Sequence, residues 1–189
     1  MYIAFKKVSF EEFRKSTPFF SDEESKKAYD NIKLPKRATK GSAGYDFFAP
    51  FDIALKAGEE ISIPTGIRCY MPEDIVLMIY PRSGLGIRNR LQLNNVVGIV
   101  DSDFVFSDNE GHISITMIND NRKGVDVEVP AGKGFVQGVF SKFYTTDDDS
   151  VDKERNGGFG STDGNTIWWW LFILSRYKSC LLYTSDAAD

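Results

Sequence analysis

Between residues 32 and 144 the hydrophobic residues fall into short runs separated by Gly, Pro and Asn. The run at 75–80, IVLMIY, is almost continuously apolar, as is typical of a buried strand. The segment 125–129, VDVEV, alternates strictly, and 113–118 alternates for most of its length, so each predicts a strand with one solvated face. The runs are punctuated, at intervals too short for crossover helices, by Pro64, Pro72, Pro81 and Pro130. The pattern therefore predicts a mainly β domain, folded as an antiparallel barrel or jelly roll.

Residues 1–31 show a helical pattern instead. Ser9 and Ser21 are each followed three residues later by a glutamate. This is the capping-box pattern, in which the two side chains satisfy free amides at the start of a helix. Pro18 separates the two predicted helices. We expect a helical extension that packs on the main domain.

After residue 144 the composition of the chain changes repeatedly. Residues 145–154 are polar and acidic and predict a solvated linker. Residues 155–163, RNGGFGSTD, combine glycines with an arginine, an aromatic ring and two hydroxyls. Residues 164–189 contain the apolar run IWWWLFIL, which is too short to span a bilayer and unlike the preceding domain. Our hypothesis is that this tail is frameshifted or foreign sequence, with an interfacial membrane anchor as the alternative.

Composition narrows the function classes. The chain has 189 residues, of which 42% are hydrophobic and 26% charged, as expected of one globular domain. A net charge of -4 argues against sequence-independent binding to nucleic acid, which needs a basic face. Neither a signal segment nor an apolar stretch of about 20 residues is evident, so we expect no membrane association. Cys69 and Cys180 lie far apart and form no metal or disulfide pattern, which favours a cytoplasmic location.

Two short segments of the β region could bind an ionic group. In GYDFF, residues 44–48, Asp46 lies within an aromatic run, and a turn aspartate is the simpler interpretation. In PRSGLG, residues 81–86, glycines allow backbone N–H groups to turn toward an anion, while Arg82 and Ser83 add a charge and a hydroxyl. These are the requirements of a phosphate-binding loop, although a plain glycine turn fits the segment as well.

Two further segments carry candidate catalytic groups. Asp101 emerges at the end of the apolar run VVGIV, where partial desolvation would make its carboxylate a better base, and capping of a turn is the alternative. Gln137 stands in the apolar strand GFVQGVF, where a structural hydrogen bond is the default interpretation and positioning of a water molecule the sharper one. His112 has no second His or Cys beside it, which indicates a surface or packing residue rather than a metal ligand.

Taken in order, the segments AGYDFFAP, PRSGLG, NNVVGIVDSDF, FVQGVF and RNGGFGST resemble the five motifs of the trimeric dUTPases, the dUTP diphosphatases, from about Leu34 to Asp163. The helical start, the segment GSAGYDFF and the extension NEGHI resemble a bacterial or phage branch of this family. The resemblance implies a β jelly roll, described in this family as a distorted barrel, and a homotrimer with shared active sites. It also implies Mg²⁺-dependent hydrolysis of dUTP to dUMP and diphosphate, which limits uracil in DNA and supplies dUMP for dTMP synthesis.

The resemblance further implies roles for particular residues. Asp101 would be the general base for a water that attacks the α-phosphorus, Gln137 would hold that water, and Asp46 would hold Mg²⁺ through its waters. The substrate-binding residues would be Arg82, Ser83 and Gly84 for the phosphates, a hairpin around Asn95 to Val100 with Asn95, Gly98, Ile99 and Val100 for uracil, Phe104 for the deoxyribose, and Arg155, Phe159, Ser161 and Thr162 in an arm that closes over the site.

The chain departs from the family pattern in three places. Phe104 stands where the family usually has Tyr, and residues 105–111 replace a short glycine turn, which predicts a longer hairpin tip. One residue, Asn156, separates Arg155 from the glycine pair, where many members have two. The alternatives are a dCTP deaminase-like enzyme, which Asp101 and the arm disfavour, and a regulatory protein of the same fold. Such a protein would bind a protein partner in a nucleotide-dependent way, through the N-terminal helices or residues 105–111.

Overall fold

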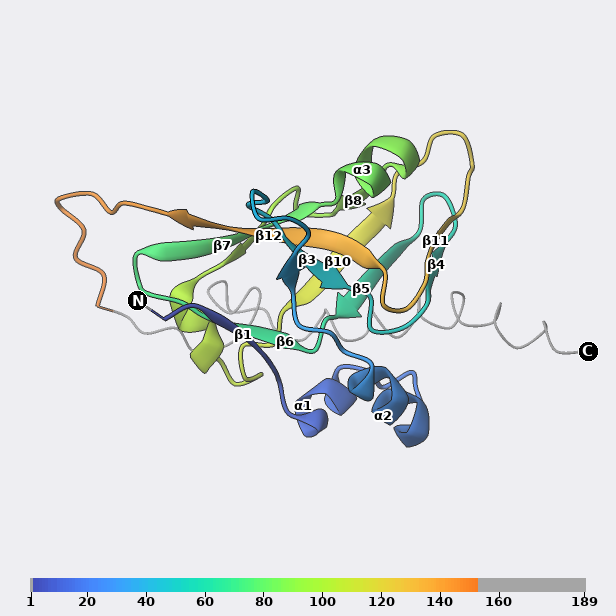
Figure 1. The fold of residues 1–189 in the computed structure, drawn as a ribbon, viewed down its shortest axis with the longest axis horizontal. Helices are drawn as coiled ribbons and strands as arrows, with labels where there is room; N and C mark the ends of the chain where they lie inside the picture. Colours follow the sequence, from blue (N-terminus) through green and yellow to red (C-terminus); the bar gives the residue numbers. More distant parts are fainter. Residues whose placement is uncertain (1, 153–189) are drawn as a thin grey trace, which may run out of the picture.

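Antiparallel strands predominate in the computed structural model, which describes residues 2–152 (Figure 1). Its elements in chain order are β1 (Ala4–Lys7), α1 (Phe10–Lys15), α2 (Asp22–Asp30), β2 (Lys36–Arg37), β3 (Tyr45–Phe48), β4 (Ile53–Leu55), β5 (Glu60–Pro64), β6 (Ile67–Tyr70), β7 (Ile75–Pro81), α3 (Ser83–Asn89), β8 (Leu91–Leu93), β9 (Gly98–Val100), the 3₁₀ helix η1 (Ser102–Phe106), β10 (Ser114–Asn119), β11 (Val127–Val129) and β12 (Gly134–Lys142).

The described strands pair into a five-stranded sheet, a three-stranded sheet and two pairs. The largest sheet has the order β2-β3-β12-β7-β9, with the long strand β12 at its centre. The three-stranded sheet has the order β5-β10-β8, and the remaining strands form β1-β6 and β11-β4. Every described pairing is antiparallel. The predicted mainly β architecture is therefore confirmed, and within the described chain the strands form separate sheets rather than a closed barrel.

The core draws on both larger sheets. On β10 the side chains alternate between buried and half-buried, as the sequence pattern predicted. On β7, however, Leu77 and Ile79 are fully buried whereas Met78 and Tyr80 are half-buried. The run 75–80 thus has one open face, although its apolar composition predicted burial throughout. The aromatic and thioether side chains on that face keep the strand apolar without placing it in the interior.

The N-terminal segment contains the two predicted helices and an additional strand. Ser9 and Ser21 are the N-caps of α1 and α2, as expected. Before α1, β1 pairs with β6, from Ala4 opposite Tyr70 to Lys7 opposite Ile67. Residues 1–31 are therefore not only helical. The strand escapes sequence reasoning because four residues that include two lysines show too little periodicity.

Two short helices occur in the β region where turns were predicted. The segment after Pro81 forms α3 despite two glycines, which disfavour a helix interior. After Asp101 the chain forms η1, followed by a turn, instead of the expected hairpin tip at 105–111. Gly111 in that turn has φ +69°, and a Cβ atom there would lie 2.5 Å from the Cα atom of Val105. Glycine is therefore required for this turn to lie against η1.

Two expectations from composition concern the cysteines and the membrane. Cys69 is buried on β6, and burial raises the pKa of its thiol to about 12, so the thiol is protonated at neutral pH. Cys180 lies outside the described residues. Within residues 2–152 there is no helix with the length and apolar character that crossing a membrane requires.

Candidate active site

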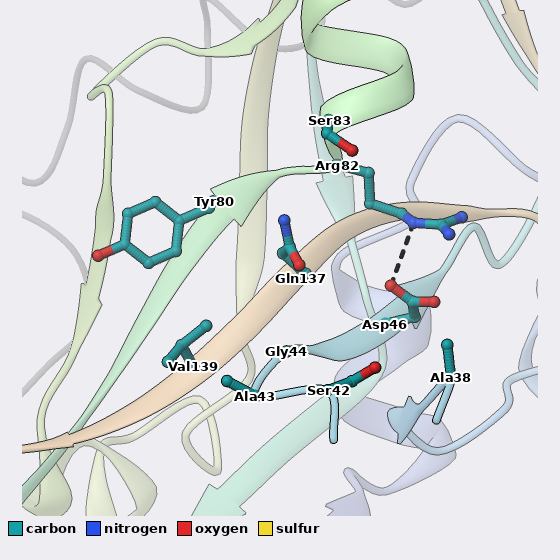
Figure 2. Close-up of a pocket in the computed structure, with 10 residues that line it drawn as sticks. All are labelled: Ala38, Ser42, Ala43, Gly44, Asp46, Tyr80, Arg82, Ser83, Gln137 and Val139. Carbon is teal, nitrogen blue, oxygen red and sulfur yellow. Dashed lines mark ion pairs between the residues drawn. The ribbon is translucent and has the colours of Figure 1, made fainter. Parts of the chain in front are cut away.

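A pocket of about 410 Å³ opens on one face of the five-stranded sheet, over β3, β12 and β7 (Figure 2). Four predicted site residues, Asp46, Arg82, Ser83 and Gln137, meet in it although they come from three separate segments. The complete lining is Ala38, Ser42, Ala43, Gly44, Asp46, Tyr80, Arg82, Ser83, Gln137 and Val139. The fold thus brings a carboxylate, a guanidinium, a hydroxyl and an amide into one cavity.

Strand register explains why these side chains share the pocket. Gln137 on β12 lies opposite Asp46 on β3 and opposite Tyr80 on β7. Directly opposed residues in antiparallel strands point to the same face, so the three side chains form one row across the sheet. Val139 lies two residues beyond Gln137 and faces the same side.

The ionic end of the pocket is formed by Asp46 and Arg82. Arg82 Nε lies 3.1 Å from Asp46 Oδ1, and Arg82 Nη1 donates a hydrogen bond to the Gly134 carbonyl at 3.3 Å. The Arg82 side chain is 37% exposed and that of Asp46 17%. A guanidinium has five N–H donors, so Arg82 can hold Asp46 and still donate to an anion in the pocket.

Gln137 occupies the middle of the row. Its Nε2 donates to the Pro81 carbonyl at 3.3 Å, so the predicted structural hydrogen bond is confirmed. On the other side, a Cβ atom at Gly44 would lie 2.5 Å from Gln137 Oε1, so only glycine allows this close approach. The amide is therefore held between two strands while its face remains in the pocket. Positioning of a water by Gln137 stays a prediction.

The segment around Asp101 lies elsewhere. Asn95 and Ile99 are exposed, Gly98 and Val100 are buried, and Asp101 is half-buried as the N-cap of η1. β9 pairs with β7 at the edge of the sheet, on the opposite side of β7 from β12. None of these residues lines the pocket as described for this single chain.

The predicted hairpin around Asn95 to Val100 is wrong in its pairing. β8 pairs with β10 in the three-stranded sheet, whereas β9 pairs with β7 in the larger one. The connection is therefore a link between two sheets, with Val96 in the left-handed region at φ 66°. The sequence signalled a turn but not that its two strands pair with different partners.

Two more of the predicted site residues that the structure describes, Phe104 and Gly84, do not line the pocket. Phe104 is 2% exposed and belongs to the core, so its predicted stacking on the sugar has little ring surface to use. Gly84 is exposed in the first turn of α3 and does not line the cavity. Outside the described residues lie the predicted contacts of the arm, Arg155, Phe159, Ser161 and Thr162, together with the tail from residue 164.

Sequence reasoning missed the apolar and small residues of the lining. Tyr80 stands two positions before Arg82, and Val139 two positions after Gln137, so the strand period of two could have identified both. Ser42 and Ala43 lie in the loop that leads into β3, the strand that carries the predicted Asp46. These side chains carry no distinctive chemistry, which is why composition alone did not single them out.

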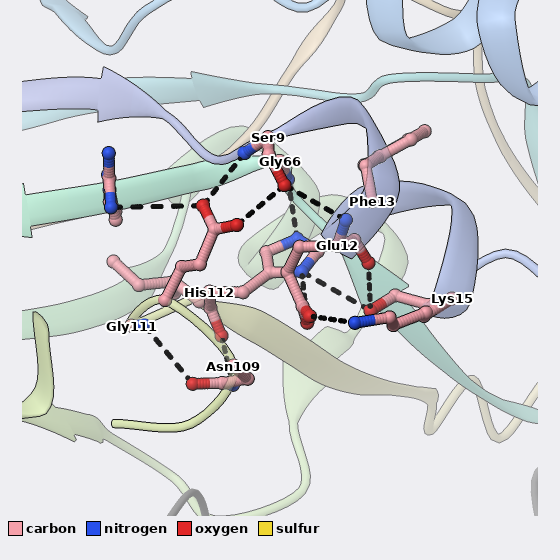
Figure 3. A network of polar contacts seen from close by, with 12 residues as sticks. Ser9, Glu12, Phe13, Lys15, Gly66, Asn109, Gly111 and His112 are labelled. Atoms are coloured by element: carbon pink, nitrogen blue, oxygen red, sulfur yellow. Dashed lines mark hydrogen bonds and ion pairs between the residues drawn. The ribbon is translucent and has the colours of Figure 1, made fainter. Parts of the chain in front are cut away.

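A second polar cluster lies under α1 (Figure 3). We call this cluster the polar junction; it consists of Ser9, Glu12, Ser16, Arg68, Glu110 and His112. His112 lies at its centre, and its side chain is 1% exposed. His112 Nε2 accepts a hydrogen bond from the Gly66 N–H at 2.8 Å, so the neutral ring carries its proton on Nδ1. That nitrogen faces Ser16 Oγ at 3.3 Å and Glu12 Oε1 at 3.7 Å. The predicted packing role of His112 is confirmed.

The polar junction extends to the start of α1. Glu110 accepts hydrogen bonds from the Ser9 backbone N–H at 2.8 Å and from Ser9 Oγ at 2.5 Å, and it lies 3.8 Å from Arg68 Nη1. The hydrogen bonds from Ser9, with the Arg68 charge, hold the pKa of Glu110 below its usual value. The capping box predicted at Ser9 is therefore incomplete, because Glu110 takes the place of Glu12 at the Ser9 amide. Ser21 forms a complete capping box with Glu24.

The described residues hold little that could bind a metal ion directly. Within residues 2–152 no three His, Cys, Asp or Glu side chains gather as a metal-binding group. In the pocket the candidate ligand is the single carboxylate of Asp46, which is already paired with Arg82. A lone carboxylate suits a cation that keeps most of its water, as Mg²⁺ does.

Comparison with known proteins identifies the family that the sequence motifs resemble. The model of the dUTPase family matches residues 30–163. Over 134 residues the chain is 43% identical to the deoxyuridine 5'-triphosphate nucleotidohydrolase of Lactococcus lactis subsp. lactis, covering 69% of this chain and 88% of that protein. It is 38% identical over 137 residues to the enzyme of the same name from Actinobacillus pleuropneumoniae, covering 69% and 87%.

Solved structures agree with this match. The crystal structure of the dUTPase from Streptococcus mutans superposes with a TM-score of 0.58 at 33% identity, covering 76% of this chain and 98% of that one. A dUTPase from phage phi11 of S. aureus, described with a structural Mg(II) ion, also gives 0.58, at 19% identity and with coverage of 81% and 98%. The phage protein supports the fold alone, whereas the sequence relatives share most of their length with this chain.

Proposed function

This chain belongs to the dUTPase family and hydrolyses dUTP to dUMP and diphosphate, and we propose that the pocket over β3, β12 and β7 is where the triphosphate is bound and cleaved. One observation carries the proposal. Asp46, Arg82, Ser83 and Gln137 converge in one cavity, and each stands in a segment that resembles a dUTPase motif. A dCTP deaminase-like activity is not favoured, because the relatives from Lactococcus lactis and Actinobacillus pleuropneumoniae are nucleotidohydrolases of dUTP.

The pocket supplies positive charge and hydrogen-bond donors suited to phosphate oxygens. Arg82 is already oriented by Asp46 and by the Gly134 carbonyl, so little ordering is needed when an anion binds. Ser83 adds a hydroxyl at the same end of the cavity. Because phosphoryl transfer depends mainly on positioning and on charge neutralisation, these groups match the needs of the reaction.

We propose that Asp46 holds Mg²⁺ through water molecules. Mg²⁺ dehydrates reluctantly and is usually bound by one or two carboxylates together with substrate phosphates. When bound, it would neutralise charge on the triphosphate. Asp46 has one oxygen, Oδ1, at the Arg82 guanidinium, and the other can accept from a coordinated water.

The remaining catalytic groups are proposed to come from neighbouring copies in a homotrimer. Asp101 and the segment from Asn95 to Val100 lie on β9 or next to its ends, and none of them lines the pocket of its own chain. Large apolar side chains near them are exposed, with Val96 75% and Phe106 79% accessible. Burial of this apolar surface against another copy would favour assembly. Assembly would then carry Asp101 of one copy to the pocket of another.

In this arrangement the residues act in sequence. Gln137 holds a water, Asp101 takes its proton, and the resulting oxygen attacks the α-phosphorus. The bond from that phosphorus to the bridging oxygen breaks, and diphosphate leaves. Backbone groups from Asn95 to Val100 would read uracil, and a base that left them unpaired would be rejected. The arm with Arg155, Phe159, Ser161 and Thr162 would close over the site.

The decisive experiment compares two aspartates of the same segment. We predict that Asp101→Asn lowers kcat for dUTP by about 10²–10⁴ while leaving nucleotide binding nearly intact, because removal of a general base affects the chemical step. Asp103→Asn is the matched control, because Asp103 is exposed and its substitution removes the same charge two residues away. Diphosphate release is measured from dUTP, dTTP, dCTP and UTP side by side.

Two results would contradict the proposal. If Asp101→Asn kept the wild-type rate, Asp101 would not be the base. If the wild-type chain released ammonia from dCTP instead of diphosphate from dUTP, the deaminase alternative would replace hydrolysis. A regulatory interaction with another protein stays a prediction, which a pull-down with and without dUTP tests.

A further inference from the structure

One wall of the pocket is a loop. Four of the ten lining residues, Ala38, Ser42, Ala43 and Gly44, belong to the connection between β2 and β3. We call residues 38–44 the wall loop. It borders the row of Asp46 and Gln137 in Figure 2. Connecting segments are usually the most mobile parts of a fold, so the shape of the pocket depends on what holds this loop.

Arg37, the last residue of β2, binds the far part of the wall loop. Its Nη1 donates hydrogen bonds to the Lys40 carbonyl at 2.9 Å and to the Ser42 carbonyl at 3.2 Å. Its guanidinium carbon lies 5.9 Å from the centre of the Tyr45 ring. Arg37 and Tyr45 are opposed in the β2–β3 pairing, so their side chains share a face of the sheet. Arg37 thus joins the middle of the wall loop to the sheet face that carries Tyr45.

The wall loop also has internal hydrogen bonds. The Thr39 N–H donates to Ser42 Oγ at 3.2 Å, the two hydroxyls lie 2.7 Å apart, and the Ser42 N–H donates to the Thr39 carbonyl at 3.2 Å. These contacts close the turn on itself but attach it to nothing else. Among the residues that the structure describes, Arg37 donates the side-chain hydrogen bonds that tie this turn to the sheet.

The support continues beneath Tyr45 into the N-terminal strand. Tyr45 packs against Phe5 of β1 and against Phe140 of β12, with ring centres 5.5 and 5.6 Å away. Phe5 also contacts Phe47, at 5.5 Å. Aromatic pairs at these separations stabilise beyond the apolar area that they bury. Residue 5 precedes the range 30–163 that matches the family model, so this support belongs to the chain's own N-terminal segment.

We propose that Arg37 is a positioning residue of the pocket, which holds the wall loop in place for substrate binding. The inference rests on the proposed function, in which this pocket binds dUTP. Arg37 acts through Ser42 and Gly44 rather than on the nucleotide, because it does not line the cavity. Gly44 in turn lies against Gln137 Oε1, so a displaced loop would also release the amide that is proposed to hold the attacking water.

The test separates positioning from charge. Arg37→Ala removes the two hydrogen bonds and one positive charge, whereas the control Lys40→Ala removes a charge from the same loop but keeps the carbonyl that Arg37 binds. We expect Arg37→Ala to lower kcat/KM for dUTP about three- to tenfold, the effect of losing exposed hydrogen bonds. The loss should be the same at low and high salt, and Arg37→Lys should restore it in part. Lys40→Ala should keep the wild-type value at high salt.

A second measurement does not depend on activity. Amide hydrogen exchange in residues 38–44 should be faster in Arg37→Ala than in the wild type and in Lys40→Ala, because the hydrogen bonds from Arg37 to the wall loop have been removed. Unchanged exchange would overturn the proposal. So would a kinetic defect that disappears at high salt or that Lys40→Ala shares, because Arg37 would then act as a surface charge. A wild-type chain inactive on dUTP would refute the proposed function, and the exchange result would still decide the role of Arg37.

Discussion

The pocket and the polar junction are both clusters of charged and polar side chains, yet they differ in what their hydrogen bonds are for. In the junction, His112 is 1% exposed and both of its ring nitrogens face protein groups. In the pocket, Arg82 is 37% exposed and combines protein contacts with an open side. Buried polar groups with complete partners stabilise a fold, whereas pre-oriented groups beside a cavity can bind a ligand. The residue types in the sequence do not by themselves show whether a polar cluster stabilises the fold or can bind a ligand.

The largest effect that would sharpen this comparison is on activity. Arg82→Ala is expected to lower kcat/KM for dUTP by about 10²–10³, because it removes the positive charge that is proposed to bind the phosphates. The melting temperature should change little, since partly exposed ion pairs contribute about 0–1 kcal/mol. Arg14→Ala is the control, because Arg14 is also an ion-paired arginine, with Asp22, but lies in α1. A similar activity loss in both variants would remove the distinction.

The second effect is on stability and has the opposite signature. His112→Leu leaves the buried Gly66 N–H without its acceptor and removes the ring that faces Glu12, at an expected cost of about 1–3 kcal/mol in the free energy of unfolding. The value of kcat/KM at a temperature where the variant is folded should match the wild type. Thermal unfolding and dUTP hydrolysis measured on the same sample check this. An activity loss in fully folded protein would show that the junction reaches the active site.

The smallest effect is a pH dependence of the junction. The pKa of Glu110 is lowered in the folded protein, chiefly by hydrogen bonds from Ser9. Its stabilising contribution is therefore complete above the unfolded pKa of about 4.3 and is lost as the pH falls through the lower folded value. The unfolding free energy of the wild type should decline more steeply in that acidic range than that of Glu110→Gln. Parallel pH profiles for the two proteins would contradict this assignment.

Much of the fold follows from local pattern. The alternation at 113–118 and the caps at Ser9 and Ser21 each predicted an element that exists. The failures occurred where tertiary contacts override local preference. The glycines after Arg82 did not prevent α3, and β1 is too short to be recognised without its partner β6. Short elements depend on packing rather than on their own sequence.

The candidate site was predictable in chemistry but not in geometry. The motifs identified Asp46, Arg82, Ser83 and Gln137, which do meet in one pocket. They could not show that Asp101 lies outside it, because position relative to the pocket depends on sheet order rather than on sequence spacing. The ion pair between Arg82 and Asp46 has no sequence signature, and neither do the hydrogen bonds from Arg37 to the wall loop.

The hydrogen bonds from Ser9 to Glu110 also set an order of events during synthesis. They join residues 101 positions apart, so the start of α1 cannot complete its native contacts until residue 110 has been made. At a translation rate of about 5–20 residues per second, this delay is about 5–20 s. During that time the start of α1 lacks Glu110 as its partner, whereas β1 with its Phe5 ring awaits β3 and β6, which precede residue 110. The start of α1 thus reaches its native contacts later than its early place in the sequence suggests.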